Sequence, residues 1–356
     1  MSADALRNLE EENKLLRESL ARVTKEKRKG DAEIDRLSNA LSATQLQLSS
    51  VADSQGQYFS KFAKEFTVSG ILGTGGGGCV FEAENKLDEW KYAVKRIIVD
   101  PKAGKTKMKT LREVRAMAKL DHPHIIRYNS TWIEEPPEEW QEKADNTTLQ
   151  KIGSRKRQLV NYESDSVFIY IQMQLCNFSL TEWLSRNKEK ESRELGRMKK
   201  WFKQMASAVD YIHENKLIHR DLKPCNILFA SKDHLKICDM GIVIEQQVDG
   251  EVEKTMTRTG SGTEEYMSPE QRALASFNIS HVTSASDVFS LGLILAELCV
   301  VMTYDEKVRI FDNYRRGKPS FVFENANTVE FIGKLTVLEK RDRLTCKKML
   351  DEMYLS

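Results

Sequence analysis

The chain has no uninterrupted run of about 18–20 apolar residues, the length that a membrane-spanning helix requires. Its first 30 residues contain no apolar core of a secretory signal. The 6 cysteines are scattered, with no Cys-x-x-Cys pair or Cys/His grouping, which argues against a zinc site or a disulfide framework. This cysteine usage favours a reducing compartment. We therefore expect a cytoplasmic protein without a membrane partner.

A strong charge of one sign is also absent, because 55 Lys and Arg residues oppose 53 Asp and Glu residues and leave a net charge of +2. This balance gives no electrostatic reason for general nucleic-acid binding, and we expect no nucleic-acid partner. Hydrophobic residues make up 40% of the 356 residues, which is enough for a substantial core in one large or two ordinary domains.

Residues 1–55 contain no proline and no aromatic residue, and Gly30 is their only glycine. A heptad register over residues 6–51 places apolar residues at ten of its fourteen a and d positions. Asn13 occupies an a position, where asparagine fixes the register of a parallel dimer. We therefore predict a coiled-coil segment over 1–55 that forms a homodimer through 6–51. The alternative is a single amphipathic helix on a domain surface.

From Phe62 the pattern changes to short β-like runs, and from 179 onward it becomes mainly helical. A polar insert at 136–165, which begins with two prolines, predicts a mobile surface loop. The expected class is α+β, with a small β-rich lobe before a larger α-rich lobe. The expected strands cover 66–73, 79–84, 91–99, 125–133 and 167–175. The expected helices cover 107–120, 195–214, 285–300, 305–316, 326–338 and 344–353.

Glycine spacing gives the first functional signal, because Gly73, Gly75 and Gly78 match G-x-G-x-x-G between two expected strands. Such a turn lets backbone N–H groups approach phosphates, although alone it also fits an ordinary flexible hairpin. Lys95 lies in an apolar strand, and Glu113 lies on the packed face of the next helix. Because each charge is costly there unless it is paired, we predict that Glu113 holds Lys95 and directs it toward phosphates.

The strongest motif is HRDLKPCN at 219–226, which is followed by Asp-Met-Gly at 239–241 and by Ser-Pro-Glu at 268–270. Together with the features above, these motifs resemble the protein kinase family over about residues 62–354. The resemblance implies a bilobal protein kinase fold that uses ATP and Mg²⁺. Met240 stands where the family usually has Phe, a change that the flexible Met side chain should tolerate.

The resemblance also implies the roles of individual residues. Asp221 would accept the proton of the attacking hydroxyl, with Lys223 beside it as in Ser/Thr kinases, and Asn226 and Asp239 would bind Mg²⁺. His219 is expected to be a packed residue rather than a base. The implied nucleotide-binding residues are Gly73, Gly75, Gly78, Val80, Lys95, Glu113, Gln174 and Cys176, with Met173 as gatekeeper. The implied structural residues are Asp287, which would tie the catalytic loop to a buried helix, and Glu270 and Arg343, which would form an ion pair.

Several stretches, among them 112–140, 170–184 and 262–271, resemble the kinases of the alpha subunit of eukaryotic translation initiation factor 2, and most closely their endoplasmic-reticulum stress branch. The resemblance implies that this alpha subunit is the substrate and that translation is reduced. The segment 305–316 resembles the helix with which these kinases dock their substrate, although its charges also fit a solvated helix. Two alternatives are a kinase of this lineage with another substrate and a coiled-coil pseudokinase scaffold.

Activation is expected to follow from the position of Arg220 next to Asp221. In kinases with this pair, a phosphate on the activation loop satisfies the cationic pocket and orders the loop. Thr259 is the first candidate acceptor and Thr257 the second. Dimerisation through 6–51 would allow this autophosphorylation. The alternative is a loop that is ordered without phosphate.

Overall fold

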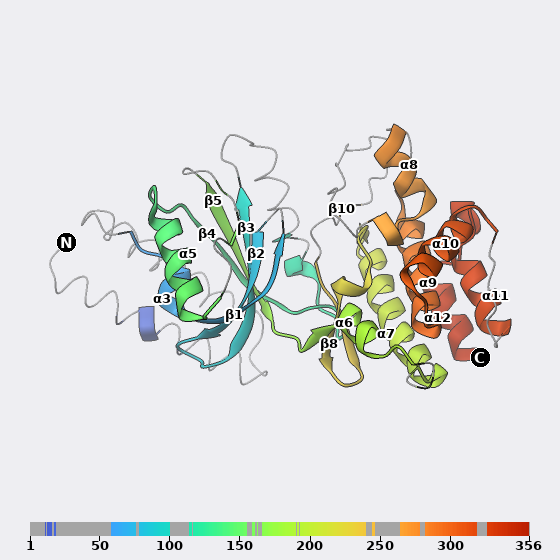
Figure 1. Ribbon diagram of the computed structural model, residues 1–356, viewed down its shortest axis with the longest axis horizontal. Coiled ribbons are helices and arrows are strands. Elements are labelled where there is room, and N and C mark those ends of the chain that lie inside the picture. Colours follow the sequence, from blue (N-terminus) through green and yellow to red (C-terminus); the bar gives the residue numbers. More distant parts are fainter. Residues whose placement is uncertain are drawn as a thin grey trace. The chain divides into compact units, whose positions relative to one another are not determined.

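The computed structural model describes residues 11, 13–15, 18, 58–75, 78–99, 114–115, 117–154, 159–160, 162, 166–189, 191, 193–239, 244–245, 264–277, 282–318 and 326–355. The chain divides into two compact units. The first consists of Met1–Lys102 and Trp132–Tyr170, and the second of Ala103–Thr131 and Ile171–Ser356. The α+β class expected from the sequence is confirmed, because one unit is built on a sheet and the other mainly on helices (Figure 1).

A five-stranded sheet in the order β1-β2-β3-β5-β4 forms the framework of the first unit. β1, β2 and β3 pair antiparallel, in a register that sets Gly75 opposite Gly78 and Val80 opposite Lys95. Residues alternate between inward and outward positions along β2, which buries Phe81 and Ala83, as expected for a strand with one covered face. The strands are β1 (Phe66–Gly75), β2 (Gly78–Asn85), β3 (Lys91–Val99), β4 (Tyr128–Glu134) and β5 (Val167–Gln174).

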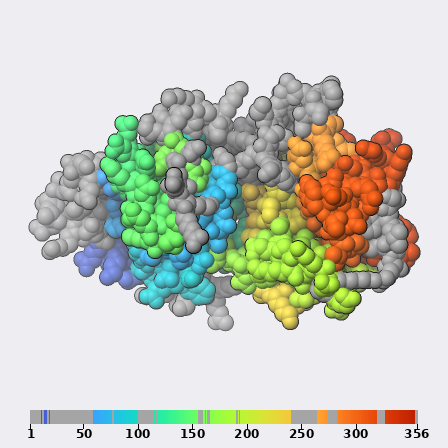
Figure 2. Space-filling model, in the orientation of Figure 1, coloured from blue at the N-terminus to red at the C-terminus, as the bar shows by residue number. Residues whose placement is uncertain are grey.

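The insert between β4 and β5 contains a helix, α5 (Trp140–Lys151), so the prediction of a loop over 136–165 is wrong for these residues. The inward face of α5 carries Gln141, Asp145 and Leu149, of which two are polar. The Asp145 carboxylate forms two hydrogen bonds of 2.6 and 2.7 Å with the Arg96 guanidinium of β3, which replaces the apolar contact that a sequence pattern would reveal. Figure 2 shows α5, in green, at the surface of this unit.

Helices dominate the second unit, and α7 and α9 each bury more residues than any of its other described helices. Of the 16 residues of α9, 12 are buried. A Cβ on Gly292 would lie 2.8 Å from Thr336 Cγ2, which shows how closely α9 approaches the residues after α11. The helices of this unit are α6 (Leu180–Arg186), α7 (Leu195–Glu214), α8 (Pro269–Phe277), α9 (Ser284–Cys299), α10 (Tyr304–Arg315), α11 (Ala326–Leu335) and α12 (Cys346–Leu355).

Short strands and single turns complete the described elements. A three-stranded sheet in the order β6-β8-β9 and the two-stranded pair β10-β7 carry the loop at 219–226. These elements are α3 (Lys61–Glu65), β6 (Phe178–Ser179), β7 (Leu217–Ile218), β8 (Ile227–Ser231), β9 (His234–Ile237), β10 (Ile244–Glu245), and the 3₁₀ turns Pro224–Asn226, Glu264–Tyr266 and Lys340–Asp342.

Two expected helices lie largely outside the described residues. Of the helix expected over 107–120, residues 114–115 and 117–119 are described, and they are helical. Of the coiled coil over 1–55, residues 11, 13–15 and 18 are described and helical, and Asn13 is buried. Within the described part of the chain, no helix combines the length and the apolar character needed to cross a membrane.

Candidate active site

Asp221, Lys223 and Asn226 come together in the turn that joins β7 to β8 in the second unit. Asp221 Oδ2 lies 2.9 Å from Lys223 Nζ. The Asn226 amide Nδ2 donates to the Asp221 backbone oxygen at 2.8 Å and to Asp221 Oδ2 at 3.2 Å. The arrangement therefore fixes one carboxylate between a cation and an amide, all three of them residues of the HRDLKPCN motif.

Asp287 of α9 holds the backbone that precedes Asp221. Its two carboxylate oxygens accept hydrogen bonds from the backbone N–H groups of His219, at 2.9 Å, and Arg220, at 2.8 Å. The His213 Nε2 of α7 lies 2.8 Å from the same carboxylate. Burial alone would raise the pKa of Asp287, but its hydrogen bonds with His213 and Arg220 keep it below the usual range. The tie between the catalytic loop and a buried helix is confirmed.

His219 is fully buried, in agreement with its interpretation as a packed residue. Its Nε2 lies 3.1 Å from the Cys238 backbone oxygen, and its Nδ1 accepts a hydrogen bond from the Asp221 backbone N–H at 3.3 Å. Both ring nitrogens thus help to position Asp221 and Cys238, the residue before Asp239. Arg220 and Asp239 have φ angles of 68° and 60°, a left-handed conformation that is costly for non-glycine residues and recurs at functional sites.

Burial raises the pKa of the Asp221 carboxyl, and the negative charge of Asp239 adds to this rise. The Lys223 ammonium acts in the opposite direction and favours the ionised carboxylate. The Asp239 carboxylate and the side-chain oxygen of Asn226, the two residues expected to bind Mg²⁺, are hard oxygen donors of the type that this ion prefers. The donor set therefore fits this ion, although the described residues contain no cluster of three His, Cys, Asp or Glu side chains arranged for a metal.

The expected nucleotide-binding residues of the first unit lie on β1, β2 and β3. Gly78 has a φ of 144°, and a Cβ there would lie 1.8 Å from the Arg96 backbone oxygen. Gly73 and Gly75 are exposed, and a Cβ on either would have no described atom within 4 Å. Val80 and Lys95 are directly opposite each other in adjacent strands, so their side chains share one face of the sheet.

In the second unit, the predicted gatekeeper Met173 and the first predicted hinge residue, Gln174, are the last two residues of β5, and Cys176 follows the strand. Met173 is buried, and Gln174 donates its backbone N–H to the Arg127 backbone oxygen at 2.9 Å. Cys176 is partly buried, and this burial raises the pKa of its thiol to about 11. A backbone hydrogen bond therefore fixes the end of β5, and the Cys176 thiol is largely protonated at neutral pH.

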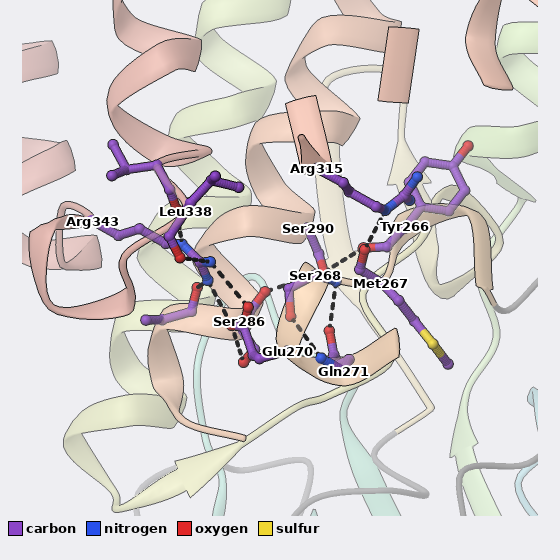
Figure 3. A network of polar contacts seen from close by, with 12 residues as sticks. Tyr266, Met267, Ser268, Glu270, Gln271, Ser286, Ser290, Arg315, Leu338 and Arg343 are labelled. Atoms are coloured by element: carbon purple, nitrogen blue, oxygen red, sulfur yellow. Dashed lines mark hydrogen bonds and ion pairs between the residues drawn. The ribbon is translucent and has the colours of Figure 1, made fainter. Parts of the chain in front are cut away.

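The predicted ion pair between Glu270 and Arg343 is confirmed and lies in a larger polar network (Figure 3). The Arg343 guanidinium donates to both Glu270 oxygens, at 2.6 and 3.0 Å, and Ser286 Oγ donates to the same carboxylate at 2.7 Å. Ser290 Oγ and Arg315 Nε donate, each at 2.8 Å, to the backbone oxygens of Tyr266 and Met267. The segment 264–270 is therefore held from α9, α10 and the turn before α12.

Four residues singled out in the sequence lie outside the described residues: Glu113, Met240, Thr257 and Thr259. Four residues that support the site were not predicted from the sequence: His213, Gln271, Ser286 and Ser290. Gln271 donates to the Arg220 backbone oxygen at 2.8 Å, so it also supports the catalytic loop. It directly follows the Ser-Pro-Glu motif, which is the one signal in the sequence that could have identified it.

The fold and the loop around Asp221 define a protein kinase. A family model described as protein kinase domain matches residues 66–355. The chain belongs to the protein kinase domain family, and Ser/Thr specificity fits the branch of this family to which its relatives belong. Protein kinases of this family generally use ATP and Mg²⁺.

The relatives include the interferon-induced, double-stranded RNA-activated protein kinase of Rattus norvegicus, which is 34% identical over 82% of this chain and 52% of the relative. The eukaryotic translation initiation factor 2-alpha kinase pek-1 of Caenorhabditis elegans is 25% identical over 84% of this chain and 45% of the relative. The eIF-2-alpha kinase GCN2 of Schizosaccharomyces pombe is 27% identical over 74% of this chain and 21% of the relative. The chain thus resembles the eIF2-alpha kinases and spans about half the length of the first two relatives.

Proposed function

We propose that this chain is a Ser/Thr kinase that transfers the γ-phosphoryl group of ATP to the alpha subunit of eukaryotic translation initiation factor 2 and thereby reduces translation. The observation that carries the proposal is the partly buried Asp221 carboxylate, held between Lys223 and Asn226 on backbone that Asp287 fixes. The names of the related kinases of Caenorhabditis elegans and Schizosaccharomyces pombe support this substrate.

In the proposed reaction, Asp221 orients the attacking hydroxyl and accepts its proton. The hydroxyl oxygen bonds to the γ-phosphorus, the bond to the oxygen shared with ADP breaks, and ADP leaves. Lys223 lies close enough to stabilise negative charge beside Asp221. Asn226 and Asp239 would hold Mg²⁺, which supplies neutralisation of charge on the phosphates.

The nucleotide would lie against the face of the sheet that carries Val80 and Lys95. The exposed backbone at Gly73 and Gly75 supports phosphate binding, because no side chain stands between its N–H groups and a ligand. The paired strands β1 and β2 keep these residues and Gly78 in one hairpin. In this proposal Lys95, held by Glu113, binds the α- and β-phosphates, and Gln174 to Cys176 contact the base.

Activation would use the guanidinium of Arg220 to bind a phosphate. Only 7% of the surface of Arg220 is exposed. Its Nε and Nη1 atoms are buried and have no hydrogen-bond partner among the described residues. Burial also lowers the pKa of this group, although the charge of Asp287 opposes that effect. A phosphate on Thr259, or on Thr257, would supply the missing acceptors and order the activation loop. Dimerisation through 6–51 would bring two chains together for this autophosphorylation.

Substrate docking is proposed for α10, as the resemblance at 305–316 implies. Tyr304 and Val308 are exposed on this helix and offer apolar contact area. Lys307 of α10 lies 2.7 Å from Glu265, and Arg315 binds the Met267 backbone oxygen. A protein docked on α10 would therefore lie close to the segment 264–267, which itself leads into the Ser-Pro-Glu motif.

The direct test is transfer of labelled phosphate from Mg-ATP to the purified initiation factor alpha subunit, with Asp221→Asn as the blank. We expect labelling that falls by at least about 10³-fold in the variant, while ATP binding persists. Autophosphorylation without substrate labelling would retain the kinase and reject this substrate. If neither product appears although ATP binds, the pseudokinase scaffold is the better description.

A further inference from the structure

The peptide group that joins Arg220 to Asp221 is held at both of its polar atoms. Its N–H, which belongs to Asp221, donates to His219 Nδ1 at 3.3 Å. Its oxygen, which belongs to Arg220, accepts a hydrogen bond of 2.8 Å from Gln271 Nε2. Because the peptide group is planar and rigid, any rotation of it would swing the Asp221 side chain. These two hydrogen bonds therefore control the direction in which the Asp221 carboxylate points.

Arg220 needs this support because its backbone is left-handed, with a φ of 68°. A non-glycine residue adopts this conformation at a cost, and the conformation persists only where the surroundings hold it. The Asp287 carboxylate holds the backbone N–H of Arg220 at 2.8 Å, and Gln271 holds its backbone oxygen. Gln271 thus fixes the second polar group of a residue whose backbone would relax if it were released.

The Gln271 side chain is itself fixed in one orientation (Figure 3). Its Oε1 accepts a hydrogen bond of 3.0 Å from the Ser268 backbone N–H, and Ser268 Oγ accepts one of 3.4 Å from the Gln271 backbone N–H. A backbone N–H can only donate and a backbone oxygen can only accept, so the amide cannot be flipped. Both residues are buried, which keeps water from taking over these hydrogen bonds.

Gln271 ties the catalytic loop to an element outside it. Lys223 and Asn226 contact Asp221 directly, but they belong to the same loop and would move with it. Gln271 belongs to α8, whose first turn is anchored by the buried ion pair described above. The hydrogen bond from Gln271 therefore sets the loop relative to a fixed part of the second unit.

We propose that Gln271 is a positioning residue for phosphoryl transfer. By holding the Arg220 backbone oxygen, it keeps the Asp221 carboxylate where it can accept the proton of the attacking hydroxyl. Gln271 acts through the backbone and takes no part in making or breaking bonds. The inference rests on the kinase reaction proposed above, but it does not depend on the identity of the protein that accepts the phosphate.

The variant Gln271→Met keeps the length of the side chain and removes its donor and its acceptor. We expect kcat for phosphate transfer to fall about 10- to 100-fold, because a displacement of about 1 Å has an effect of this size, while the KM for ATP changes less than about twofold. Thr336→Val removes another buried hydrogen bond, to the Ile332 backbone oxygen after α11, and should leave kcat unchanged. A wild-type kcat in Gln271→Met, or an equal loss in Thr336→Val, would overturn the proposal.

The variant Gln271→Glu tests the Nε2 donor through pH. A protonated carboxyl can still donate to the Arg220 backbone oxygen, whereas an ionised carboxylate cannot and repels it. Because burial raises the pKa of a carboxyl, the protonated form persists at mildly acidic pH. We expect the ratio of kcat in the variant to kcat in the wild type to fall at least about threefold between about pH 6 and about pH 8.5. This ratio cancels the titration of Asp221 itself, and a constant ratio would contradict the role of the donor.

Amide hydrogen exchange gives a measurement that needs no acceptor protein. We expect Gln271→Met to speed exchange at least about fivefold in peptides that cover 219–226 and 264–271, while α7 and α11 keep their wild-type rates. If this change occurs but the wild type transfers no phosphate, the proposed function is rejected and the hold of Gln271 on the loop is supported. Unchanged exchange over 219–226 would overturn the inference.

Discussion

Gly78 is the glycine of the G-x-G-x-x-G motif at which a side chain is least tolerated. Its φ of 144° and the Arg96 backbone oxygen, 1.8 Å from the position of a Cβ, exclude any side chain without a shift of the strand. Gly73 and Gly75 belong to the same motif, yet a Cβ on either would meet no described atom within 4 Å. The backbone thus requires a glycine at 78, whereas open space surrounds the positions of Gly73 and Gly75.

We expect Gly78→Ala to lower the free energy of unfolding by about 1–3 kcal/mol, because β2 must move away from β3. Gly75→Ala is the matched control and should change it by less than about 1 kcal/mol. Gly75→Ala should also raise the KM for ATP, since its methyl group would stand beside the phosphates. Urea denaturation measures the change in stability, and steady-state kinetics measures the change in KM. Equal stability of the two variants would contradict this view of Gly78.

At the scale of elements, a buried ion pair attaches α5 to the sheet. Asp145→Ala would leave the Arg96 guanidinium buried and uncompensated, and we expect a loss of about 3–5 kcal/mol in the free energy of unfolding. The double variant Arg96→Met/Asp145→Leu should recover most of this loss, because neither charge then remains buried. Asn146→Ala, at an exposed position of α5, serves as control. A coupling energy near zero in urea denaturation would show that the pair does not hold the helix.

A second ion pair, Glu270 with Arg343, anchors α8 to the turn before α12. Burial alone would raise the pKa of Glu270, but Arg343 keeps it below its ordinary value of 4.5. The pair therefore contributes stability above pH 4.5, and this contribution is lost as the pH falls through the lower pKa of the folded state.

We expect Arg343→Leu to lower the free energy of unfolding by about 3–5 kcal/mol at pH 7 and by less below pH 4.5, because protonation of Glu270 removes the buried charge. Denaturant titrations at several pH values measure this difference. Lys347→Leu, at an exposed position of α12, should show no such pH dependence. A loss that stays constant down to pH 3 would contradict the assignment.

These two ion pairs also show which contacts could be predicted from the sequence and which could not. The resemblance assigned roles to Asp221, Lys223 and Asn226, which lie within six residues of one another, and it identified Arg343 as the partner of Glu270. Helix α5 was missed because two of its three buried residues, Gln141 and Asp145, are polar. Their partner Arg96 lies 49 residues before Asp145, and no local periodicity reports such a contact.

At the scale of the whole molecule, the prediction concerns association of two chains. If the heptads over 6–51 form a coiled coil, Leu16→Pro should convert a dimer to a monomer, because proline interrupts the helix at a core position. Sedimentation equilibrium gives the mass directly. Glu18→Gln, a conservative change outside the a and d positions, should leave the dimer intact. An unchanged mass for Leu16→Pro would reject the coiled coil.

The Glu270–Arg343 pair has a consequence for biosynthesis, because its members are 73 residues apart in the chain. At a translation rate of about 5–20 residues per second, roughly 4 to 15 seconds separate the synthesis of Glu270 from that of Arg343. During that interval the nascent chain carries the complete loop around Asp221 but not the cation that anchors α8. The segment that leads into α8 therefore stays without this anchor until Arg343 has been synthesised.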